Sequence, residues 1–210
     1  GYTWKLRAAY QYELLATPQI VDVTEPPLKG LNPPSAEVKI GALLSLTGSQ
    51  AYTGQSIKAG LTTALADINH YLSWHGYPVT FSLDIVDTAS DANRTLSAFN
   101  TLAERGVRFI VGPQTSAECQ NVLAAANSRG IILVSPSSNA IQLAQPDDNL
   151  IRFVPSAVNE AKALALLLRG QGINSLAIMA RDDIWGADLA QRTGEEFQAL
   201  GGNVLASVTY

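Results

Sequence analysis

The sequence has few of the residues from which disulfides, metal centres and redox sites are built. It holds one cysteine, Cys119, and two histidines among 210 residues. A single cysteine excludes a disulfide within the chain and a metal cage made of cysteines. His70 and His75 are five residues apart, so they share no metal-binding helical face, and we expect both at a helix end. We therefore expect no metal and no cofactor.

Charged residues are also scarce, at 15% of the chain, and the net charge is −4. The 14 basic residues are scattered, so the cluster typical of nucleic-acid binding is missing and no such partner is expected. The longest apolar runs are too short to span a membrane. No basic segment followed by an apolar one opens the chain, which predicts that any export signal has been removed.

Nucleotide-binding motifs are missing as well. No G-x-G-x-x-G follows a strand-like run, and TGSQAYTGQS lacks the Lys-Ser/Thr of a Walker loop. What the sequence does have is apolar residues, at 47%, which is enough for a substantial core.

Residues 1–36 differ from the rest. Apolar residues occupy every second position from Tyr2 to Leu14, a period that predicts a half-buried strand. A segment with four prolines, Thr24 to Pro34, follows and is typical of a stiff linker. The strand is either a tether or an element that adds to a sheet elsewhere, which leaves homo-oligomerisation through residues 2–14 open.

From Val38 onward, strand-like and helix-like patterns alternate, which favours a parallel sheet wrapped by helices. The expected strands are 38–44, 79–86, 107–111, 131–134, 150–154, 175–179 and 203–208, and the expected helices are 55–74, 91–105, 116–129, 158–169 and 187–200. The predicted fold is therefore α/β: a doubly wound, Rossmann-like parallel sheet in residues 37–150, and the beginning of a second, similar lobe in residues 151–210.

Ligands of such sheets bind where the strand order reverses, beyond the carboxyl ends of the strands. For a strand order 2-1-3-4, three loops meet there: Ser45–Gly54, Gly112–Ser116 and Ser135–Ala140. They are rich in hydroxyl and amide side chains and nearly free of charge. Such a composition supplies hydrogen bonds rather than proton transfer.

The residues from Thr115 to Glu118 match a capping box, in which Thr115 begins a helix and Glu118 reaches back. This capping leaves Ser116 beside the free N–H groups of the first turn, where an anion such as a carboxylate would bind. Ser137, Ser138 and Asn139 are either ligand contacts or an ordinary polar turn.

An enzymatic site would have to use Cys119, or Asp182 and Asp183. Cys119 has no evident histidine near it, and we expect it to be a packed small residue. The Asp182–Asp183 pair lacks an identifiable second acid or metal, and is equally explained by a turn that starts a helix. We therefore expect no enzymatic activity.

The ordered set VKIGALLSLTGSQAYTGQSIKAGLTTALADIN, VRFIVGPQTSAE, ILVSPSSNA, LIRFVPS and DDIWGADLA resembles the type I periplasmic binding proteins of branched-chain amino-acid ABC transporters. The resemblance covers about residues 38–210, and members of that family are considerably longer. It implies two lobes that close on a small ligand.

The same resemblance implies the site. Ser116 and the backbone near Thr115 would hold the polar end of the ligand, and Ser137, Ser138 and Asn139 would supply neighbouring contacts. Tyr52 or Thr53 would cover the ligand from the first lobe, and Trp185 would present an aromatic ring from the second.

The implied function is an extracytoplasmic solute-binding protein, periplasmic or extracellular, that captures an amino acid or similar small carboxylate for an ABC transporter permease or a receptor. Attachment to a membrane is left open. The alternative is an assembly module that pairs through its N-terminal strand.

Overall fold

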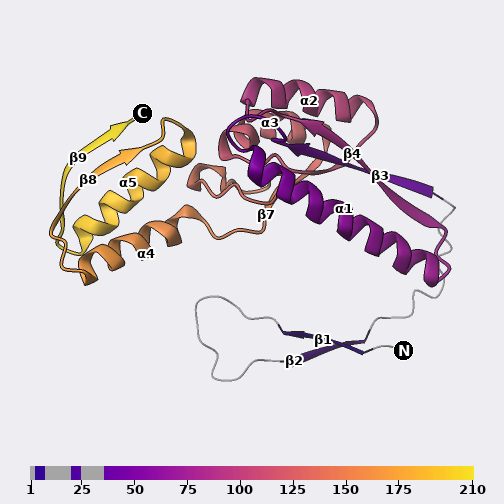
Figure 1. Cartoon of the computed structure of the whole chain (residues 1–210), viewed down its shortest axis with the longest axis horizontal. Coiled ribbons are helices and arrows are strands. Elements are labelled where there is room, and N and C mark those ends of the chain that lie inside the picture. The colour runs from indigo at the N-terminus through magenta and orange to yellow at the C-terminus, as the bar shows by residue number, and fades with distance from the viewer. Residues whose placement is uncertain (1–2, 8–19, 25–35) are drawn as a thin grey trace.

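The computed structural model describes residues 3–7, 20–24 and 36–210 (Figure 1). Strands and helices alternate along the last range, as the sequence predicts. The strands are β1 (Thr3–Arg7), β2 (Ile20–Thr24), β3 (Ala36–Leu44), β4 (Val79–Asp87), β5 (Phe109–Val111), β6 (Ile132–Ser135), β7 (Leu150–Arg152), β8 (Ser175–Ala180) and β9 (Asn203–Thr209). The helices are α1 (Ala51–Trp74), α2 (Ala92–Glu104), α3 (Ser116–Arg129), α4 (Ala157–Gly170) and α5 (Ile184–Ala199), with a short 3-10 helix, η1 (Ile141–Leu143).

The first lobe is a parallel sheet with the strand order β4-β3-β5-β6-β7. The predicted order 2-1-3-4 is confirmed, and β7 joins the sheet as a fifth strand. Strand order therefore reverses between β3 and β5, whose carboxyl ends precede two of the polar loops.

Helices cover the two faces of this sheet unequally. On one face, α2 and α3 enclose the core, which includes Leu43, Phe99, Ile110 and Leu133, all fully buried. Each such side chain contributes about 1.5–3 kcal/mol relative to leaving it exposed. On the other face, α1 packs against β3 and β4 (Figure 1). There the side-chain amide of Asn69 bonds both the N–H and the C=O of Phe81 at 2.8 Å, which fixes the helix to β4.

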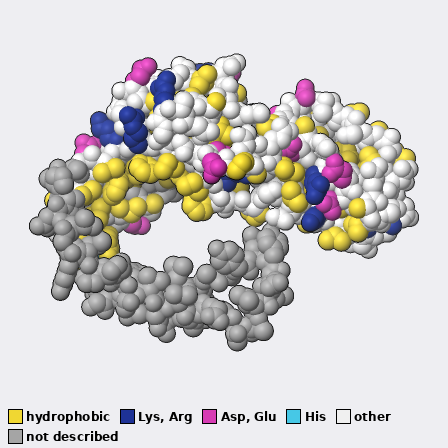
Figure 2. All heavy atoms as spheres, turned by 180° about the vertical axis from the view of Figure 1, so that it is seen from behind, with side chains coloured by type: hydrophobic (Ala, Val, Ile, Leu, Met, Phe, Trp, Pro, Cys, Tyr) yellow, Lys and Arg dark blue, Asp and Glu magenta, His cyan; other side chains and the backbone are white. Residues whose placement is uncertain are grey.

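The α1 face is open over the other half of the sheet. Strand register puts Phe109 beside Ile40 and Ile132 on this face, and Ile151 beside Val134. Phe109 and Ile151 are 51% and 46% exposed. No helix in residues 36–210 packs over β5, β6 and β7 on this side. Figure 2 shows apolar side chains gathered in a band over the lobe.

The second lobe consists of β8 and β9, which pair in parallel, and of α4 and α5. Helices α4 and α5 pack on each other, and α5 packs on both strands. Phe197 of α5 is fully buried there, whereas Met179 and Leu205 on the strands, and Tyr210 directly after β9, are exposed. These elements have a two-stranded sheet of their own, apart from the sheet of the first lobe.

Near the N-terminus, β1 pairs antiparallel with β2 of the same chain. The predicted strand over residues 2–14 is confirmed for residues 3–7, and residues 8–14 lie outside the described part. The segment Ile20–Thr24 was not expected to be a strand. The proline-rich segment from residue 25 to residue 34 also lies outside the described residues.

Two helices begin earlier than predicted. Helix α1 starts at Ala51 rather than near Gln55, and its N-cap residue, Gln50, makes no side-chain capping bond, so the sequence carries no cap signal there. Helix α5 starts at Ile184 rather than near Ala187, because Asp183 caps it by accepting a hydrogen bond from the N–H of Gly186 at 2.8 Å.

Candidate functional site

A cleft of about 370 Å³ lies between the two lobes, at the carboxyl ends of the first-lobe strands. This volume is within the range of small-molecule sites. Its lining residues come from three first-lobe loops and from the start of α5: Gln50, Thr53, Gln114, Thr115, Ser116, Ser137, Asn139, Arg181 and Trp185. Of these nine, Arg181 alone is charged.

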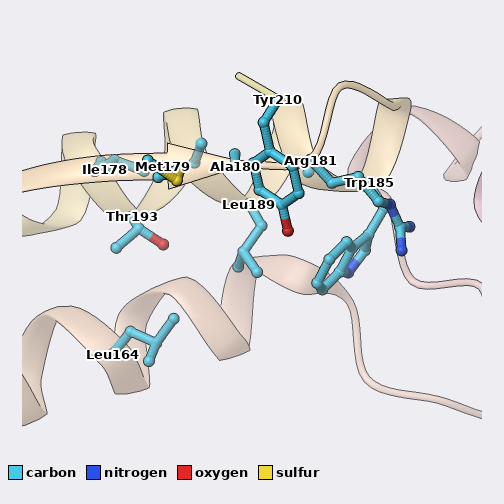
Figure 3. A pocket seen from close by; sticks show the side chains of 11 residues that line it. Leu164, Ile178, Met179, Ala180, Arg181, Trp185, Leu189, Thr193 and Tyr210 are labelled. Carbon is cyan, nitrogen blue, oxygen red and sulfur yellow. The ribbon is translucent and has the colours of Figure 1, made fainter. Parts of the chain in front are cut away.

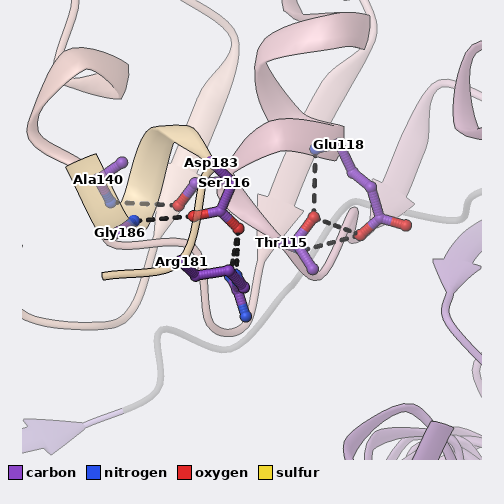
Figure 4. A network of polar contacts seen from close by, with 7 residues as sticks. All are labelled: Thr115, Ser116, Glu118, Ala140, Arg181, Asp183 and Gly186. Atoms are coloured by element: carbon purple, nitrogen blue, oxygen red, sulfur yellow. Dashed lines mark hydrogen bonds and ion pairs between the residues drawn. The ribbon is translucent and has the colours of Figure 1, made fainter. Parts of the chain in front are cut away.

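Helix α3 begins at this cleft with the predicted capping box, which is confirmed (Figure 4). The Thr115 hydroxyl accepts a hydrogen bond from the N–H of Glu118 at 3.2 Å. The Glu118 carboxylate accepts bonds from the N–H and the hydroxyl of Thr115, both at 2.9 Å. The N–H and O–H donors of Thr115 are therefore engaged within the protein.

Glu118 also ties α3 to its neighbours. Its other carboxylate oxygen accepts hydrogen bonds from the hydroxyls of Ser45 and Thr95, both at 3.2 Å. The Ser45 hydroxyl is in turn 3.1 Å from that of Thr88. Glu118 is almost completely buried, and these donors offset the cost of removing its charge from water. The network holds the ends of β3 and β4 and the start of α3 in one arrangement.

The donors left free by the capping box belong to Ser116 and Ala117. The first N–H groups of a helix have no partner within it, and here only that of Glu118 is capped. The Ser116 oxygen accepts a bond from the N–H of Ala140 at 3.2 Å, while its hydrogen has no acceptor among the described residues. Among the described residues, the N–H and O–H of Ser116 and the N–H of Ala117 therefore have no acceptor, and Ser116 presents its donors at the cleft, at the positive end of the α3 dipole.

Gln114 was not among the predicted site residues, yet it lines the cleft and is 3% exposed. Its Nε2 donates to the backbone oxygen of Gln50 at 3.3 Å, which fixes the orientation of the amide. Its Oε1 accepts no hydrogen bond from the described residues. A buried acceptor without a donor is costly, so Oε1 is suited to a donor on a ligand. Gln114 follows Gly112-Pro113 in a loop, and nothing in this sequence pattern indicates that its side-chain amide is buried at a binding site.

In the loop Ser135–Ala140, some side chains line the cleft and others are buried in the interior. Ser137 lines the cleft and donates its hydroxyl hydrogen to the backbone oxygen of Gln114 at 2.6 Å. Asn139 lines the cleft and donates to Glu160 of α4 at 3.1 Å. Ser138 is not among the lining residues, because its side chain is buried beside Cys119.

Of the two residues expected to cover the ligand from the first lobe, Thr53 lines the cleft. Tyr52 does not, and it is 89% exposed, because the early start of α1 turns it to solvent. The start of α1 lies close against β3: a Cβ on Gly54 would be 2.1 Å from the Ser45 carbonyl oxygen.

Asp87, at the end of β4, orders the first loop. Its carboxylate accepts hydrogen bonds from the N–H groups of Leu46, Thr47 and Ala89 and from the Thr47 hydroxyl. Burial raises the pKa of Asp87, but these hydrogen bonds outweigh that effect and lower the pKa below its ordinary value. The carboxylate therefore stays ionised and keeps the loop in place beside the cleft.

The second lobe contributes Trp185 and Arg181. Trp185 lies in the first turn of α5 and lines the cleft, as the sequence predicted. Arg181 was not predicted. It directly follows β8, and its guanidinium carbon is 5.1 Å from the centre of the Trp185 ring. Both residues also line an apolar hollow of about 320 Å³ between α4, α5 and β8 (Figure 3).

The remaining sequence candidates have structural roles. Cys119 is fully buried, and burial raises the pKa of its thiol despite hydrogen bonds with Ser138 and Ser135. Asp183 caps α5, as the turn interpretation held. No group of side chains in the described part could hold a metal ion. None of its helices is both long and apolar enough to cross a membrane.

Comparison with known proteins connects this geometry to a family. The sequence model of a periplasmic binding protein family matches residues 37–210. An uncharacterized protein of Methanocaldococcus jannaschii is 30% identical over 179 residues, which cover 82% of this chain and 43% of the relative. A Leu/Ile/Val-binding protein of Rhizobium johnstonii is 33% identical over 108 residues, which cover 51% and 29%. The chain spans less than half the length of these relatives.

Solved structures share the fold. The leucine-binding protein LivK of Thermotoga maritima superposes with a TM-score of 0.74 at 20% identity, over 81% of this chain and 48% of that one. A solute-binding protein of an ABC transporter from Rhodopseudomonas palustris, in complex with 3,4-dihydroxybenzoic acid, superposes with a TM-score of 0.69 at 19% identity, over 82% and 47%. The sequence match over residues 37–210 shows that this chain belongs to the periplasmic binding protein family.

Proposed function

We propose that the chain binds a small organic carboxylate in the cleft between its two lobes, as the ligand-capturing part of an extracytoplasmic binding protein that serves an ABC transporter. The observation that carries the proposal is the start of α3. There, Ser116, whose N–H and hydroxyl hydrogen have no partner among the described residues, lines a cleft whose far side carries Arg181 and Trp185.

The chemistry of this site is binding rather than turnover. Eight of the nine lining residues are uncharged. Hydrogen-bond donors at a helix N-terminus stabilise an anion without transferring a proton to it. The ring of Trp185 supplies apolar surface for the rest of the ligand. The family is one of binding proteins, which supports the expectation that the chain is not an enzyme.

Two structural neighbours agree with a carboxylate ligand. One is described as a leucine-binding protein and the other is in complex with 3,4-dihydroxybenzoic acid. Leucine and a benzoic acid differ in shape and in their amino and hydroxyl groups, and they share a carboxylate. That shared group is the one that the start of α3 is suited to hold.

The test is isothermal titration calorimetry of the intact protein against amino acids, aliphatic acids and aromatic acids. We expect at least one carboxylate to bind, and Ser116→Ala to weaken its binding by roughly tenfold or more, because a hydrogen bond to a charged group is lost. Absence of binding to every carboxylate by a protein that is folded by circular dichroism would refute the proposal.

A further inference from the structure

Arg181 is held rigidly at the cleft by two neighbours. Its Nε donates to Oδ2 of Asp183 at 2.5 Å, and its Nη2 pairs with the same oxygen (Figure 4). The guanidinium also lies against the Trp185 ring, as Figure 3 shows. An arginine fixed by an ion pair and a stacked ring loses little further conformational entropy when it binds a ligand.

Asp183 cannot move freely to follow the arginine. Its Oδ1 accepts the hydrogen bond from the N–H of Gly186 that caps α5. A Cβ on Gly186 would lie 2.1 Å from the backbone oxygen of Arg181, so the start of α5 is closely packed on this loop. The guanidinium of Arg181 therefore has one edge, Nε and Nη2, that is bound to Asp183, and a second edge that can bind another partner.

The spare edge is the nitrogen Nη1, which has no acceptor among the described residues. The side chain is 40% exposed and lines the cleft. Guanidinium groups prefer carboxylate oxygens as partners, because their planar set of N–H donors matches the carboxylate. A ligand whose apolar end lay against Arg181 would shield Nη1 from water. The N–H groups of Nη1 would then have no acceptor, which costs free energy.

Ser116 of the first lobe and Arg181 of the second lobe thus line the same cavity of about 370 Å³. We propose that Arg181 is a specificity-determining residue that binds a second carboxylate, so that the preferred ligands are short dicarboxylates rather than monocarboxylates with an apolar tail. This inference rests on the proposed function, because the first carboxylate is taken to bind at α3.

The experiment compares matched acids by calorimetry on the intact protein. Straight-chain dicarboxylates from malonate to adipate are each paired with the monocarboxylate of the same carbon number. We expect at least one dicarboxylate to bind tenfold or more tightly than its partner, which corresponds to about 1.4 kcal/mol. Arg181→Gln should reduce this ratio to near one, because the dicarboxylate alone loses the partner of its second carboxylate.

Arg192→Gln is the matched control, because Arg192 also lies in the second lobe in ion pairs, with Glu195 and Glu196, yet does not line the cleft. It should keep the wild-type ratio. If Arg181→Gln does not fold, Arg181→Lys, which keeps the charge but loses the planar donor edge, should lower the ratio.

The outcomes separate the two proposals. A wild-type protein that binds monocarboxylates as tightly as dicarboxylates overturns the role of Arg181 and leaves the proposed function standing. A ratio unchanged in Arg181→Gln or Arg181→Lys overturns it as well. Binding of no carboxylate overturns the proposed function itself.

Discussion

Asp188 of α5 and Gln142 of η1 join the two lobes. Oδ2 of Asp188 accepts a hydrogen bond from the backbone N–H of Gln142 at 3.2 Å, and Oδ1 accepts one from its Nε2 at 2.8 Å. Beside this contact, Ile184 packs on a small apolar cluster that includes Cys119 and Leu143. The lobes are therefore in direct contact next to the cleft, which fixes where Trp185 lies relative to Ser116.

Asp188→Ala should weaken this junction. Hydrogen bonds to a charged group contribute about 1.5–3 kcal/mol, so we expect the free energy of unfolding to fall by about 2 kcal/mol, measured by urea denaturation. Ligand affinity should fall too, because the lobes lose their fixed relation. Asp182→Ala is the control, since Asp182 is exposed and its side chain makes no hydrogen bond in the described part. Equal effects of the two substitutions would contradict the role of Asp188.

Thr115→Ala should destabilise the protein by about 1–2 kcal/mol, because it removes the hydroxyl that caps α3 by accepting from the Glu118 N–H and that donates to the Glu118 carboxylate. Thr115→Ser keeps the hydroxyl and should restore most of this loss. The midpoint of urea unfolding measures both. A serine variant as unstable as the alanine variant would show that packing of the Thr115 methyl group, and not capping, is responsible.

Gln114→Leu should discriminate between ligands. We expect the orphan Oε1 to accept a bond from a ligand O–H or N–H, so the variant should bind malate about tenfold more weakly and succinate with nearly unchanged affinity. Gln120→Leu, on the exposed side of α3, should leave both affinities unchanged. Equal losses for malate and succinate in the Gln114 variant would rule out this contact.

Stability should depend on the ionisation of Asp87. Its pKa in the folded protein is lowered by hydrogen bonds, so its contribution is present at neutral pH and is lost in acid as the pH falls through the folded pKa. Asp87→Asn should be less stable at pH 7 and should show a shallower loss of stability in acid. Asp67→Asn, at an exposed position of α1, is the control. The melting temperature between pH 3 and pH 7 measures the effect, and parallel profiles would contradict it.

Cys119 should be inert in the folded protein. Its thiol is fully buried and its pKa is raised, so little thiolate is present and reagents have no access. We expect labelling by a maleimide or an aromatic disulfide at pH 8 to be at least about 100-fold slower than in urea. Rapid labelling of the native chain would show that the α3 and η1 contact opens readily.

Much of the fold was predictable because its signals are local. The periods of the apolar residues identified the strands and helices from β3 to β9. The order of the first sheet was assumed in order to place the ligand site, and the structure shows that order. The capping box at Thr115 and Glu118 is written in four consecutive residues, so the start of α3 was placed correctly. The start of α1 was missed because Gln50 makes no capping bond.

The candidate site was predictable in part, and Trp185 of the second lobe, which was expected at the cleft, also lines it. Ser116, Ser137 and Asn139 follow strands at the reversal point, and they line the cleft as expected. Gln114 and Arg181 were missed, since an amide or an arginine in a loop is usually solvated. The resemblance implied that Tyr52 or Thr53 covers the ligand, and because α1 starts early, Thr53 lines the cleft and Tyr52 does not.

By itself, the sequence determined the alternation of strands and helices, the helix cap at α3 and the family, because these depend on neighbouring residues and on ordered motifs. The tertiary structure decided which polar groups are free. A donor or acceptor counts for binding only after its partners within the protein are known, and those partners, such as Gln50 for Gln114 and Asp183 for Arg181, are set by how the loops of the two lobes meet.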